Sequence, residues 1–293
     1  MQRVAEAVSH GAITVVNAIA TGRGAALGVS LWTKARVTLT DRAGEIRGRN
    51  LTEVKEDPTL IETTVRRVFR RFRLHRRFGA DVETRSCIPT AAGLKSSSAA
   101  SNAVALATLR ALGKKVSDLE TVNLGVDASL EAGVTLTGAF DDACACYFGG
   151  LVVTDNTRRR VLKRFNPEGD LRVLIHVPGK KIYTKNVDPN QLKNVSSLVR
   201  VAHREAVKGN YWLSLTLNGL IYSLALGHDT FPAKEALRAG AIASGLSGKG
   251  PASAAIVPDS RVEDVLSVWS SLSGRIIETS LNRKKAQILR LAG

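Results

Sequence analysis

Hydrophobic and polar positions follow a strand-like pattern in the first forty residues of the chain. Small and β-branched residues dominate the stretches 12–20 and 31–39, a composition typical of strands. Gly22, Gly24 and Gly28 lie between these stretches, and glycine adopts the positive φ angles of tight turns without strain. We therefore expect strands near the N-terminus that are joined by turns at these glycines.

A helical period replaces this pattern after Asp57-Pro58, where apolar residues recur every three or four positions. Proline is favoured in the first turn of a helix, so we expect a helix to begin here. Its apolar positions are Ile61, Val65, Val68, Phe69 and Phe72, and its other faces carry Arg66, Arg67, Arg70, Arg71, Arg73, Arg76 and Arg77.

The rest of the chain mixes both patterns, which predicts an α+β fold. A charged turn at 156–160 indicates a boundary between two lobes, 1–155 and 156–293. Ser117 and Glu120 form a capping box, so a helix should begin there and end near Gly133. We further expect strands at 81–86, 151–153, 171–177, 252–257 and 276–277, and helices at 96–112, 191–207, 210–226, 232–240 and 262–272.

The composition is that of a folded protein that attracts anions. Hydrophobic residues make up 44% of the 293 residues and charged residues 23%, which excludes a disordered chain. The net charge of +16 favours nucleic acid, anionic lipid, or phosphorylated and carboxylated small molecules. Cys87, Cys144 and Cys146 form no C-x-x-C pair and predict no metal cluster. Without an apolar run of spanning length or a signal-peptide pattern, we expect a cytoplasmic protein with no membrane partner.

The segment from Pro89 to Ala100 is the strongest indication of chemistry. A turn at Gly93, the cation Lys95 and the hydroxyls of 96–98 directly precede an apolar helix. The free N–H groups and the dipole of a helix N-terminus bind phosphate, and a lysine adds a full positive charge. A serine-rich helix cap is the simpler interpretation, but the lysine and the long helix favour phosphate. The Walker pattern G-x-x-x-x-G-K-[ST] is absent from the chain.

Acidic residues form a second candidate site. Glu131 lies near a predicted helix end, and Asp141 and Asp142 follow on a turn of small residues. Adjacent carboxylates repel each other, so their presence points to Mg²⁺ ligation or to a general base. The structural alternative is that one of them caps a following helix. A third segment, 245–251, is rich in glycine, which lets a backbone approach a ligand closely.

In this order the three segments resemble the GHMP small-molecule kinase superfamily, which includes galactokinase, homoserine kinase and mevalonate kinase. The superfamily's G-x-x-D turn is matched by Gly138 and Asp141, and its C-terminal glycine-rich motif by 247–251. Its motif P-x-x-x-G-L-x-S-S-x-A is matched by Pro89, Gly93, Leu94, Ser96, Ser97 and Ala99.

Within the superfamily the chain is most similar to the archaeal-type shikimate kinases. The similarity lies in 10–26, 93–100 and 137–150. Lys95 replaces the glycine usual in the superfamily, a replacement typical of this branch. The common P-G-R first motif of the superfamily is missing near the N-terminus, which is a departure from its pattern.

The resemblance implies a two-lobed fold, with a ribosomal-S5-like N-terminal lobe and a C-terminal α/β sandwich lobe. It implies phosphorylation of the 3-hydroxyl of shikimate by ATP, giving shikimate 3-phosphate and ADP for aromatic amino acid biosynthesis. Asp141 would take or orient the hydroxyl proton, and Ser97 and Glu131 would hold Mg²⁺. The residues that would wrap the ATP phosphates are Pro89, Thr90, Ala91, Ala92, Gly93, Leu94, Lys95, Ser96, Ser97, Ser98 and Ala99.

The choice of substrate depends on the N-terminal segment with Asn17, Thr21 and Arg23, which favours shikimate. The carboxylate of shikimate requires a cation, and Arg23 and Arg158 are both candidates. The alternative is another kinase of the superfamily, such as homoserine kinase, with the same fold and ATP site. A nucleic-acid-binding protein is a second alternative, raised by the arginine-rich helix at 66–77. Recognition motifs for nucleic acid are missing, so we expect no specific nucleic-acid partner. The oligomeric state stays open.

Overall fold

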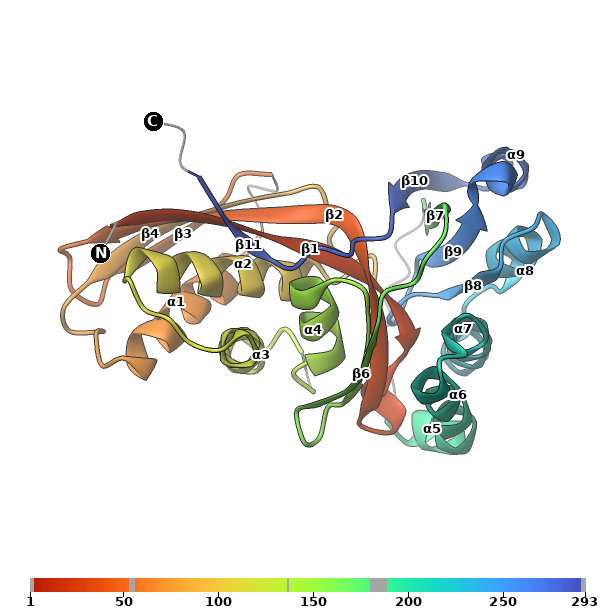
Figure 1. Ribbon diagram of the computed structural model, residues 1–293, viewed down its shortest axis with the longest axis horizontal. Coiled ribbons are helices and arrows are strands. Elements are labelled where there is room, and N and C mark those ends of the chain that lie inside the picture. The colour runs from red at the N-terminus through yellow and green to blue at the C-terminus, as the bar shows by residue number, and fades with distance from the viewer. Residues whose placement is uncertain (1–2, 53–55, 136, 180–188, 291–293) are drawn as a thin grey trace.

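The larger of two β-sheets forms the first layer of the molecule (Figure 1). Its seven strands in the described chain are β1 (Val4–Val16), β2 (Arg23–Thr40), β3 (Ile46–Asn50), β4 (Gly79–Ser86), β5 (Leu151–Asp155), β6 (Arg160–Phe165) and β11 (Gln287–Leu289). The computed structural model describes residues 3–52, 56–135, 137–179 and 189–290. The strand order is β11-β1-β2-β4-β3, with β5 paired to β2 and to β6. Only the β3–β4 pair is parallel among these pairings.

Helices cover one face of this sheet (Figure 1), and β11 extends the sheet beyond β1 as an edge strand. The helix α2 packs directly on β1 and β2, and α1 and α3 pack on α2. Arg110 is the single charged residue of α2, so small uncharged side chains let it lie buried between the sheet and the other helices. The helices are α1 (Thr59–Arg71), α2 (Ser96–Ala111), α3 (Asp118–Glu131) and α4 (Phe140–Phe148).

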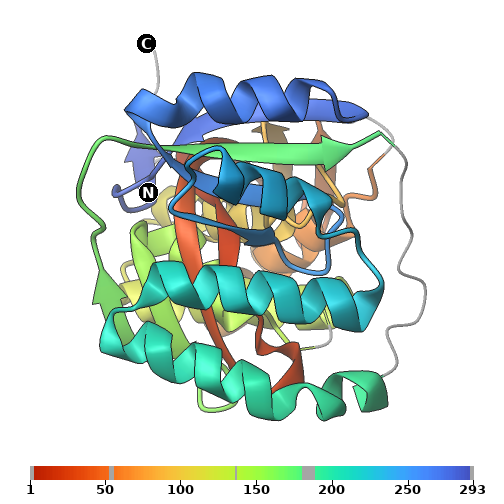
Figure 2. The ribbon, with the colours of Figure 1, turned by 90° about the vertical axis from the view of Figure 1, so that its right-hand side faces the viewer.

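A second, antiparallel sheet and five further helices make up the rest of the described chain. Figure 2 shows these helices as the layer that faces the viewer. The strand order of the second sheet is β10-β7-β9-β8. The strands are β7 (Leu171–Pro178), β8 (Ala243–Leu246), β9 (Ser253–Pro258) and β10 (Gly274–Ser280). The helices are α5 (Pro189–Asn194), α6 (Ser196–Lys208), α7 (Tyr211–Leu226), α8 (Phe231–Arg238) and α9 (Val262–Ser270), and short 3₁₀ turns are η1 (Ala18–Ala20) and η2 (Asp259–Arg261).

One continuous hydrophobic core joins the two sheets. Ile13 and Leu27 of the first sheet belong to the same cluster of buried side chains as Ile175 and Ile256 of the second. The division of the chain at residues 155 and 156 therefore stays a prediction. Two strands that follow it in sequence, β6 and β11, belong to the first sheet. None of the described helices combines the length and hydropathy needed to cross a membrane.

The α+β class and most predicted elements are confirmed. The helix expected after Asp57-Pro58 is α1, and Ile61, Val65, Val68 and Phe69 form its buried face. The capping box is also present, because the Ser117 hydroxyl accepts the Glu120 N–H over 3.1 Å at the start of α3. These features depend on residues a few positions apart, which is why the pattern of the chain predicts them.

The prediction of turns at Gly24 and Gly28 is wrong, because both glycines lie inside the strand β2. Gly22 does form a turn, with φ of +67°. A Cβ on Gly24 would lie 2.2 Å from Oδ2 of Asp141, and one on Gly28 would lie 3.2 Å from Cα of Gly149. Close approach of α4 to the strand, and not a turn, therefore requires these two glycines.

The acidic pair was expected on a turn but lies in the first turn of α4. Ala139 precedes this helix with φ of +47° and provides no side-chain cap. The pattern of the chain also did not predict the strands β3, β6 and β11. β3 and β6 are rich in arginine and β11 has three residues, so none has the alternation that identifies a strand in sequence.

Candidate active site

The predicted phosphate loop has the backbone of an anion site. Ala91, Gly93 and Lys95 all have left-handed φ angles, of +54°, +80° and +66°. Alternating left-handed residues turn successive backbone N–H groups toward one side, where they form a concave nest for anions. α2 then begins at Ser96 without a side-chain cap, so the N–H groups of its first turn remain available to a ligand.

A cavity of about 220 Å³ opens in front of this loop. Thr90, Ser96 and Ser97 of the loop line it together with the start of α1. The other lining residues are Thr33, Asn50, Thr52, Glu56, Asp57, Pro58, Thr59, Leu60, Ile61, Thr84, Ser86, Ile88, Ala100, Ala132 and Val134. The mixture of apolar and hydroxyl side chains beside a phosphate-binding helix end suits a nucleotide.

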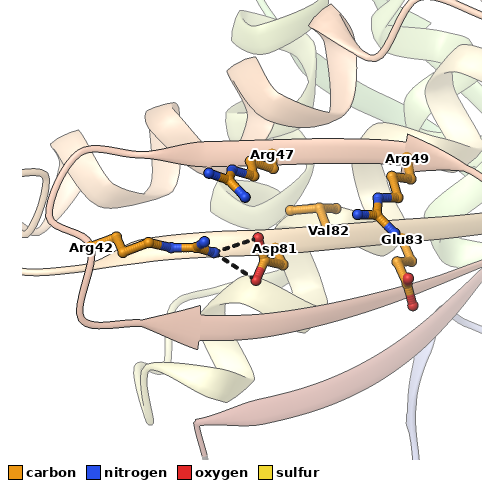
Figure 3. Close-up of a pocket in the computed structure, with 6 residues that line it drawn as sticks. All are labelled: Arg42, Arg47, Arg49, Asp81, Val82 and Glu83. Carbon is orange, nitrogen blue, oxygen red and sulfur yellow. Dashed lines mark hydrogen bonds and ion pairs between the residues drawn. The ribbon is translucent and has the colours of Figure 1, made fainter.

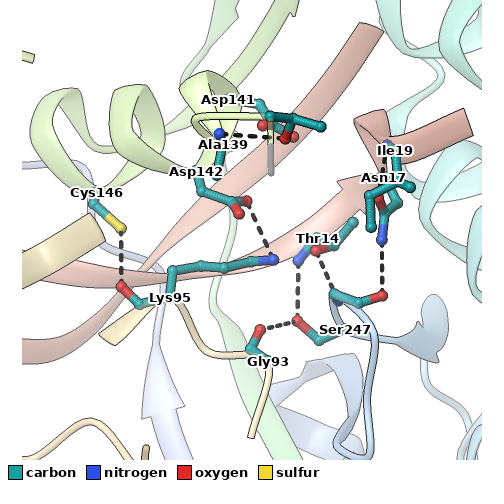
Figure 4. A network of polar contacts seen from close by, with 12 residues as sticks. Thr14, Asn17, Ile19, Gly93, Lys95, Ala139, Asp141, Asp142, Cys146 and Ser247 are labelled. Atoms are coloured by element: carbon teal, nitrogen blue, oxygen red, sulfur yellow. Dashed lines mark hydrogen bonds and ion pairs between the residues drawn. The ribbon is translucent and has the colours of Figure 1, made fainter. Parts of the chain in front are cut away.

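The glycine-rich segment 245–251 closes onto the phosphate loop from the second sheet (Figure 4). The buried Ser247 hydroxyl donates to Gly93 O over 2.8 Å and accepts the Thr14 N–H over 3.1 Å. The Gly248 N–H donates to Thr14 Oγ1 over 2.8 Å. Gly93 has no room for a side chain, since a Cβ there would lie 2.2 Å from Ser247 O. The first and third predicted segments are thus one structural unit.

Asp141 lies at the start of α4 with only 3% of its surface exposed. Its Oδ1 accepts a hydrogen bond from Asn156 Nδ2 over 2.7 Å. Burial, and next the negative charge of Asp142, raise the pKa of Asp141 to about 7. A carboxyl group that titrates near neutral pH is well suited to general base catalysis.

Asp142 has a different partner from its neighbour. Its Oδ1 lies 3.2 Å from Nζ of Lys95, and both side chains are largely buried. Figure 4 shows Lys95 extending from the start of α2 across to Asp142, beside the turn that holds Ser247. A Cβ on Gly248 would lie 3.1 Å from the same Nζ. Lys95 thereby joins the phosphate loop, the acidic pair and the glycine-rich segment.

The three predicted substrate residues lie close together but differ in availability. Asn17 already uses both ends of its amide, because Nδ2 donates to Gly248 O over 2.9 Å and Oδ1 accepts the Ile19 N–H over 3.0 Å. The Thr21 hydroxyl bonds to the backbone of Arg23. The exposed Arg23 guanidinium forms no ion pair or side-chain hydrogen bond with any described residue. Arg158 instead pairs with Asp155 at 3.1 Å.

The two predicted Mg²⁺ ligands are in different situations. The half-buried Ser97 lines the cavity. Glu131, at the end of α3, is held by two arginines of α1, with Arg67 Nε and Arg70 Nη1 each 2.8 Å from one of its oxygens. The Arg67 contact is an ion pair without hydrogen-bond geometry. Ser97 is therefore available to a metal bound with nucleotide, whereas both carboxylate oxygens of Glu131 contact arginines. The described residues contain no group of three or more acidic, histidine or cysteine side chains arranged for a metal.

The arginine-rich helix α1 is largely neutralised by neighbouring acids. Besides Arg67 and Arg70, Arg66 pairs with Glu62 and Arg71 with Glu120 of α3, at 3.0 and 2.7 Å. The Arg66–Glu62 pair lies within α1, whereas the pairs of Arg67, Arg70 and Arg71 fasten α1 to α3, so these arginines have an intramolecular role.

A second hollow lies on the open face of the first sheet and is lined by paired charges (Figure 3). Arg42 donates to both oxygens of Asp81 over 2.9 Å. Arg47 forms an ion pair with Glu45. The charged side chains alternate in sign across β3 and β4, an arrangement typical of a solvated sheet face.

Sequence reasoning missed several polar residues that build the site. Asn156 contacts Asp141, and Asn218 and Tyr222 of α7 hold the end of β1. Asn218 Oδ1 accepts the Asn17 N–H over 2.9 Å, and the Tyr222 hydroxyl donates to Asn17 O over 3.1 Å. The sequence does carry one signal for Asn218, because it is a polar residue on the apolar helix 211–226. A buried asparagine requires a hydrogen-bond partner, so its position indicates a polar contact there.

Comparison with known proteins identifies the fold. Residues 59–150 match the family described as GHMP kinases N terminal domain. A homoserine kinase structure from Cytophaga hutchinsonii superposes with a TM-score of 0.77 at 16% identity, covering 99% of this chain and 98% of that one. A Lactococcus lactis galactokinase complexed with galactose gives 0.74 at 14% identity, covering 98% and 96%. The fold is that of the GHMP kinases.

More similar sequences are found among archaeal proteins. A shikimate kinase of Methanothrix thermoacetophila is 46% identical over 96% of this chain and 95% of its own length. Shikimate kinases of Methanosarcina mazei and Pyrococcus abyssi are 45% and 44% identical, over 96% and 92% of this chain and 95% and 96% of their own lengths. The chain belongs to this family of archaeal shikimate kinases within the GHMP kinases, which confirms the resemblance drawn from its motifs.

Proposed function

We propose that the protein phosphorylates the 3-hydroxyl of shikimate with ATP, releasing shikimate 3-phosphate and ADP. The observation that carries the proposal is the buried Asp141, whose helix is joined to the phosphate loop through the Asp142–Lys95 ion pair. A base with a pKa near 7 beside an anion-binding helix end is the arrangement that phosphoryl transfer to an alcohol requires. The relatives named shikimate kinase support the choice of alcohol.

In the proposed reaction the hydroxyl oxygen of the acceptor bonds to the γ-phosphorus while its proton passes to Asp141. The bond from the γ-phosphorus to the leaving oxygen of ADP breaks. Phosphoryl transfer asks mainly for positioning and for neutralisation of charge. The free N–H groups at the start of α2 and the ammonium of Lys95 would meet the negative charge on the phosphates.

ATP is the donor implied by membership of a kinase family, and the cavity beside Ser97 is its proposed site. Ser97 would contact Mg²⁺ that arrives with the nucleotide, and the ion would supply charge neutralisation on the phosphate oxygens. The role of Glu131 as a second ligand stays a prediction, since its two oxygens contact Arg67 and Arg70. The expected cytoplasmic location also stays a prediction.

Arg23 is the cation that we propose for the carboxylate of shikimate. It immediately precedes Gly24, which packs on Asp141, so its backbone lies next to the contact with the proposed base along β2. Its guanidinium is exposed and unpaired among the described residues, whereas that of Arg158 is engaged by Asp155. A free guanidinium can make two parallel hydrogen bonds to a carboxylate.

The test is release of ADP from Mg·ATP in the presence of shikimate, homoserine or mevalonate, each supplied separately. We expect ADP with shikimate alone, and formation of shikimate 3-phosphate in equal amount. ADP released with homoserine in place of shikimate would show a kinase of different acceptor. An Arg23→Gln variant should raise the KM for shikimate strongly, while its KM for ATP stays unchanged, and Arg158→Gln is the matched control.

A further inference from the structure

Asn156 contacts the proposed base, although it is not itself one of the groups proposed to react. Its side chain is buried, and Nδ2 donates to Asp141 Oδ1 over 2.7 Å. At the other end of the amide, Asn156 Oδ1 accepts the hydroxyl of Thr154 over 2.6 Å. Its backbone N–H donates to Gly22 O over 2.8 Å. The amide is therefore fixed at both ends and at its backbone.

Thr154 and the Asp141 carboxylate together fix the direction of the Asn156 amide. Thr154 is fully buried in β5, where its hydroxyl donates to Asn156 Oδ1. An amide oxygen accepts hydrogen bonds and an amide nitrogen donates them, so Nδ2 must face the carboxylate. The reversed amide would place its oxygen against Asp141 Oδ1, which is unfavourable when the carboxylate is charged. The other acceptor near the hydroxyl is Gly24 O, at the longer distance of 3.3 Å.

The two oxygens of Asp141 are consequently inequivalent. Oδ1 is occupied by Asn156, whereas Oδ2 has no side-chain hydrogen bond within the described residues. Oδ2 lies against the bare Cα of Gly24, where an added Cβ would approach to 2.2 Å. The absence of a side chain at position 24 thus gives the Asp141 carboxylate the room to lie here.

We propose that Asn156, oriented by Thr154, is a positioning residue that holds Asp141 through Oδ1 and leaves Oδ2 to receive the proton of the acceptor hydroxyl. The inference rests on the proposed function, because it assigns that proton to one oxygen of the proposed base. Asn156 itself touches neither reacting atom. It acts through the orientation and the charge of Asp141, and small errors in such an orientation slow a reaction considerably.

The titration of Asp141 reports on this contact. The hydrogen bond from Asn156 favours the charged carboxylate and so lowers the pKa of Asp141, against the larger effect of burial. Asp142 of the same helix raises that pKa, and Lys95, from the start of α2, lowers it. Cys144 of α4 and Tyr222 of α7 also face this charge, and both remain protonated near neutral pH because their own pKa values are raised. Burial likewise raises the pKa of the Cys146 thiol.

The first experiment compares Asn156→Ala with the unaltered protein, using kcat and kcat/KM for shikimate between pH 5.5 and 9. We expect kcat to fall roughly 10- to 100-fold, because the carboxylate is no longer held. The acidic limb of kcat/KM should move upward by about one pH unit, since a donor to the charged form is lost. The KM for ATP should stay unchanged, because Asn156 does not line the nucleotide cavity.

Milder variants keep the test valid if Asn156→Ala folds poorly. Thr154→Val removes only the hydroxyl that orients the amide, and it should shift the acidic limb in the same direction by a smaller amount. Thr154→Ser keeps the hydroxyl and should restore the original profile. Thr108→Val is the matched control, because Thr108 is equally buried and its hydroxyl bonds to Val104 O within α2. An unmoved pH profile and kcat in both Asn156→Ala and Thr154→Val would overturn the proposal.

A measurement without turnover separates this inference from the proposed function. The carboxyl carbon of Asp141 can be followed by NMR during a pH titration, with Asp141→Asn identifying its signal. The midpoint should rise in Asn156→Ala whether or not shikimate is the substrate. A protein inactive with shikimate but with a shifted midpoint would refute the proposed function and keep the positioning role. An identical midpoint in both proteins would refute the positioning role.

Discussion

At the scale of single residues, two adjacent aspartates receive different properties from their surroundings. Asp141 is buried against Gly24 and Asn156, and its one side-chain donor is neutral. Asp142 forms an ion pair with Lys95. Neighbouring carboxyl groups in unlike environments can take different roles, and Asp141 is the one whose pKa is raised to about 7. This difference is why Asp141 is the base that we propose.

Replacement of the base is the first prediction. Asp141→Asn keeps the shape of the side chain and its acceptor for Asn156, so the protein should fold. Turnover should fall roughly 10²- to 10⁴-fold, the usual contribution of a general base. ADP release with shikimate measures the loss, and circular dichroism checks the fold. If Asp142→Asn proves the more damaging change, the base is Asp142 instead.

The pH dependence of stability is the second prediction. The folded-state pKa of Asp141, about 7, lies above its ordinary value of 3.8, so the folded protein binds this proton more tightly than the unfolded chain. The stabilising contribution is complete below about pH 4 and is lost as the pH rises toward 7. Asp141→Asn should therefore gain stability relative to the unaltered protein across this window, as measured by urea unfolding at each pH. A constant difference between the two proteins would contradict the raised pKa.

At the scale of elements, the start of α2 combines a local and a long-range requirement. The left-handed residues of the loop are a local feature, and its glycine was visible in the sequence. The contact between Gly93 and Ser247 joins positions 154 residues apart and was not visible. The glycine-rich segment 245–251 therefore shapes the phosphate loop as well as lying beside it.

Loss of the Ser247 hydroxyl is the third prediction. Ser247→Ala leaves Gly93 O and the Thr14 N–H without their buried partner. The free energy of unfolding should fall by about 1–3 kcal/mol, the cost of burying unpaired polar groups. The KM for ATP should rise as well, because the phosphate loop loses its support. Ser271→Ala, at an exposed serine that follows α9, is the control for urea unfolding.

At the scale of the whole molecule, the end of the chain returns to the first sheet. The strand β11 pairs with β1, and Ala286, which is buried, donates its N–H to Tyr147 O over 2.6 Å. Asn282 exchanges backbone hydrogen bonds with Gly28 and Gly150. The segment thus ties the second sheet to α4, the helix that bears the acidic pair.

Removal of this segment is the fourth prediction. A chain that ends at residue 281 loses β11 and the buried contacts of Asn282 and Ala286, so its melting temperature should fall by roughly 10 °C or more. A chain that ends at residue 290 keeps all these contacts and should melt like the full chain. Equal melting temperatures for both truncations would show that the segment contributes little.

The sequence by itself determined the α+β class, the family and the helices with clear periods or caps. These features depend on residues close together in the chain, such as Ser117 with Glu120, or on a motif of contiguous positions. The tertiary structure alone decided that Gly24 faces Asp141, that Asn17 is occupied by Gly248, and that two arginines hold Glu131. Such contacts arise when distant segments pack, and one sequence carries no local signal for a partner that the fold brings from elsewhere.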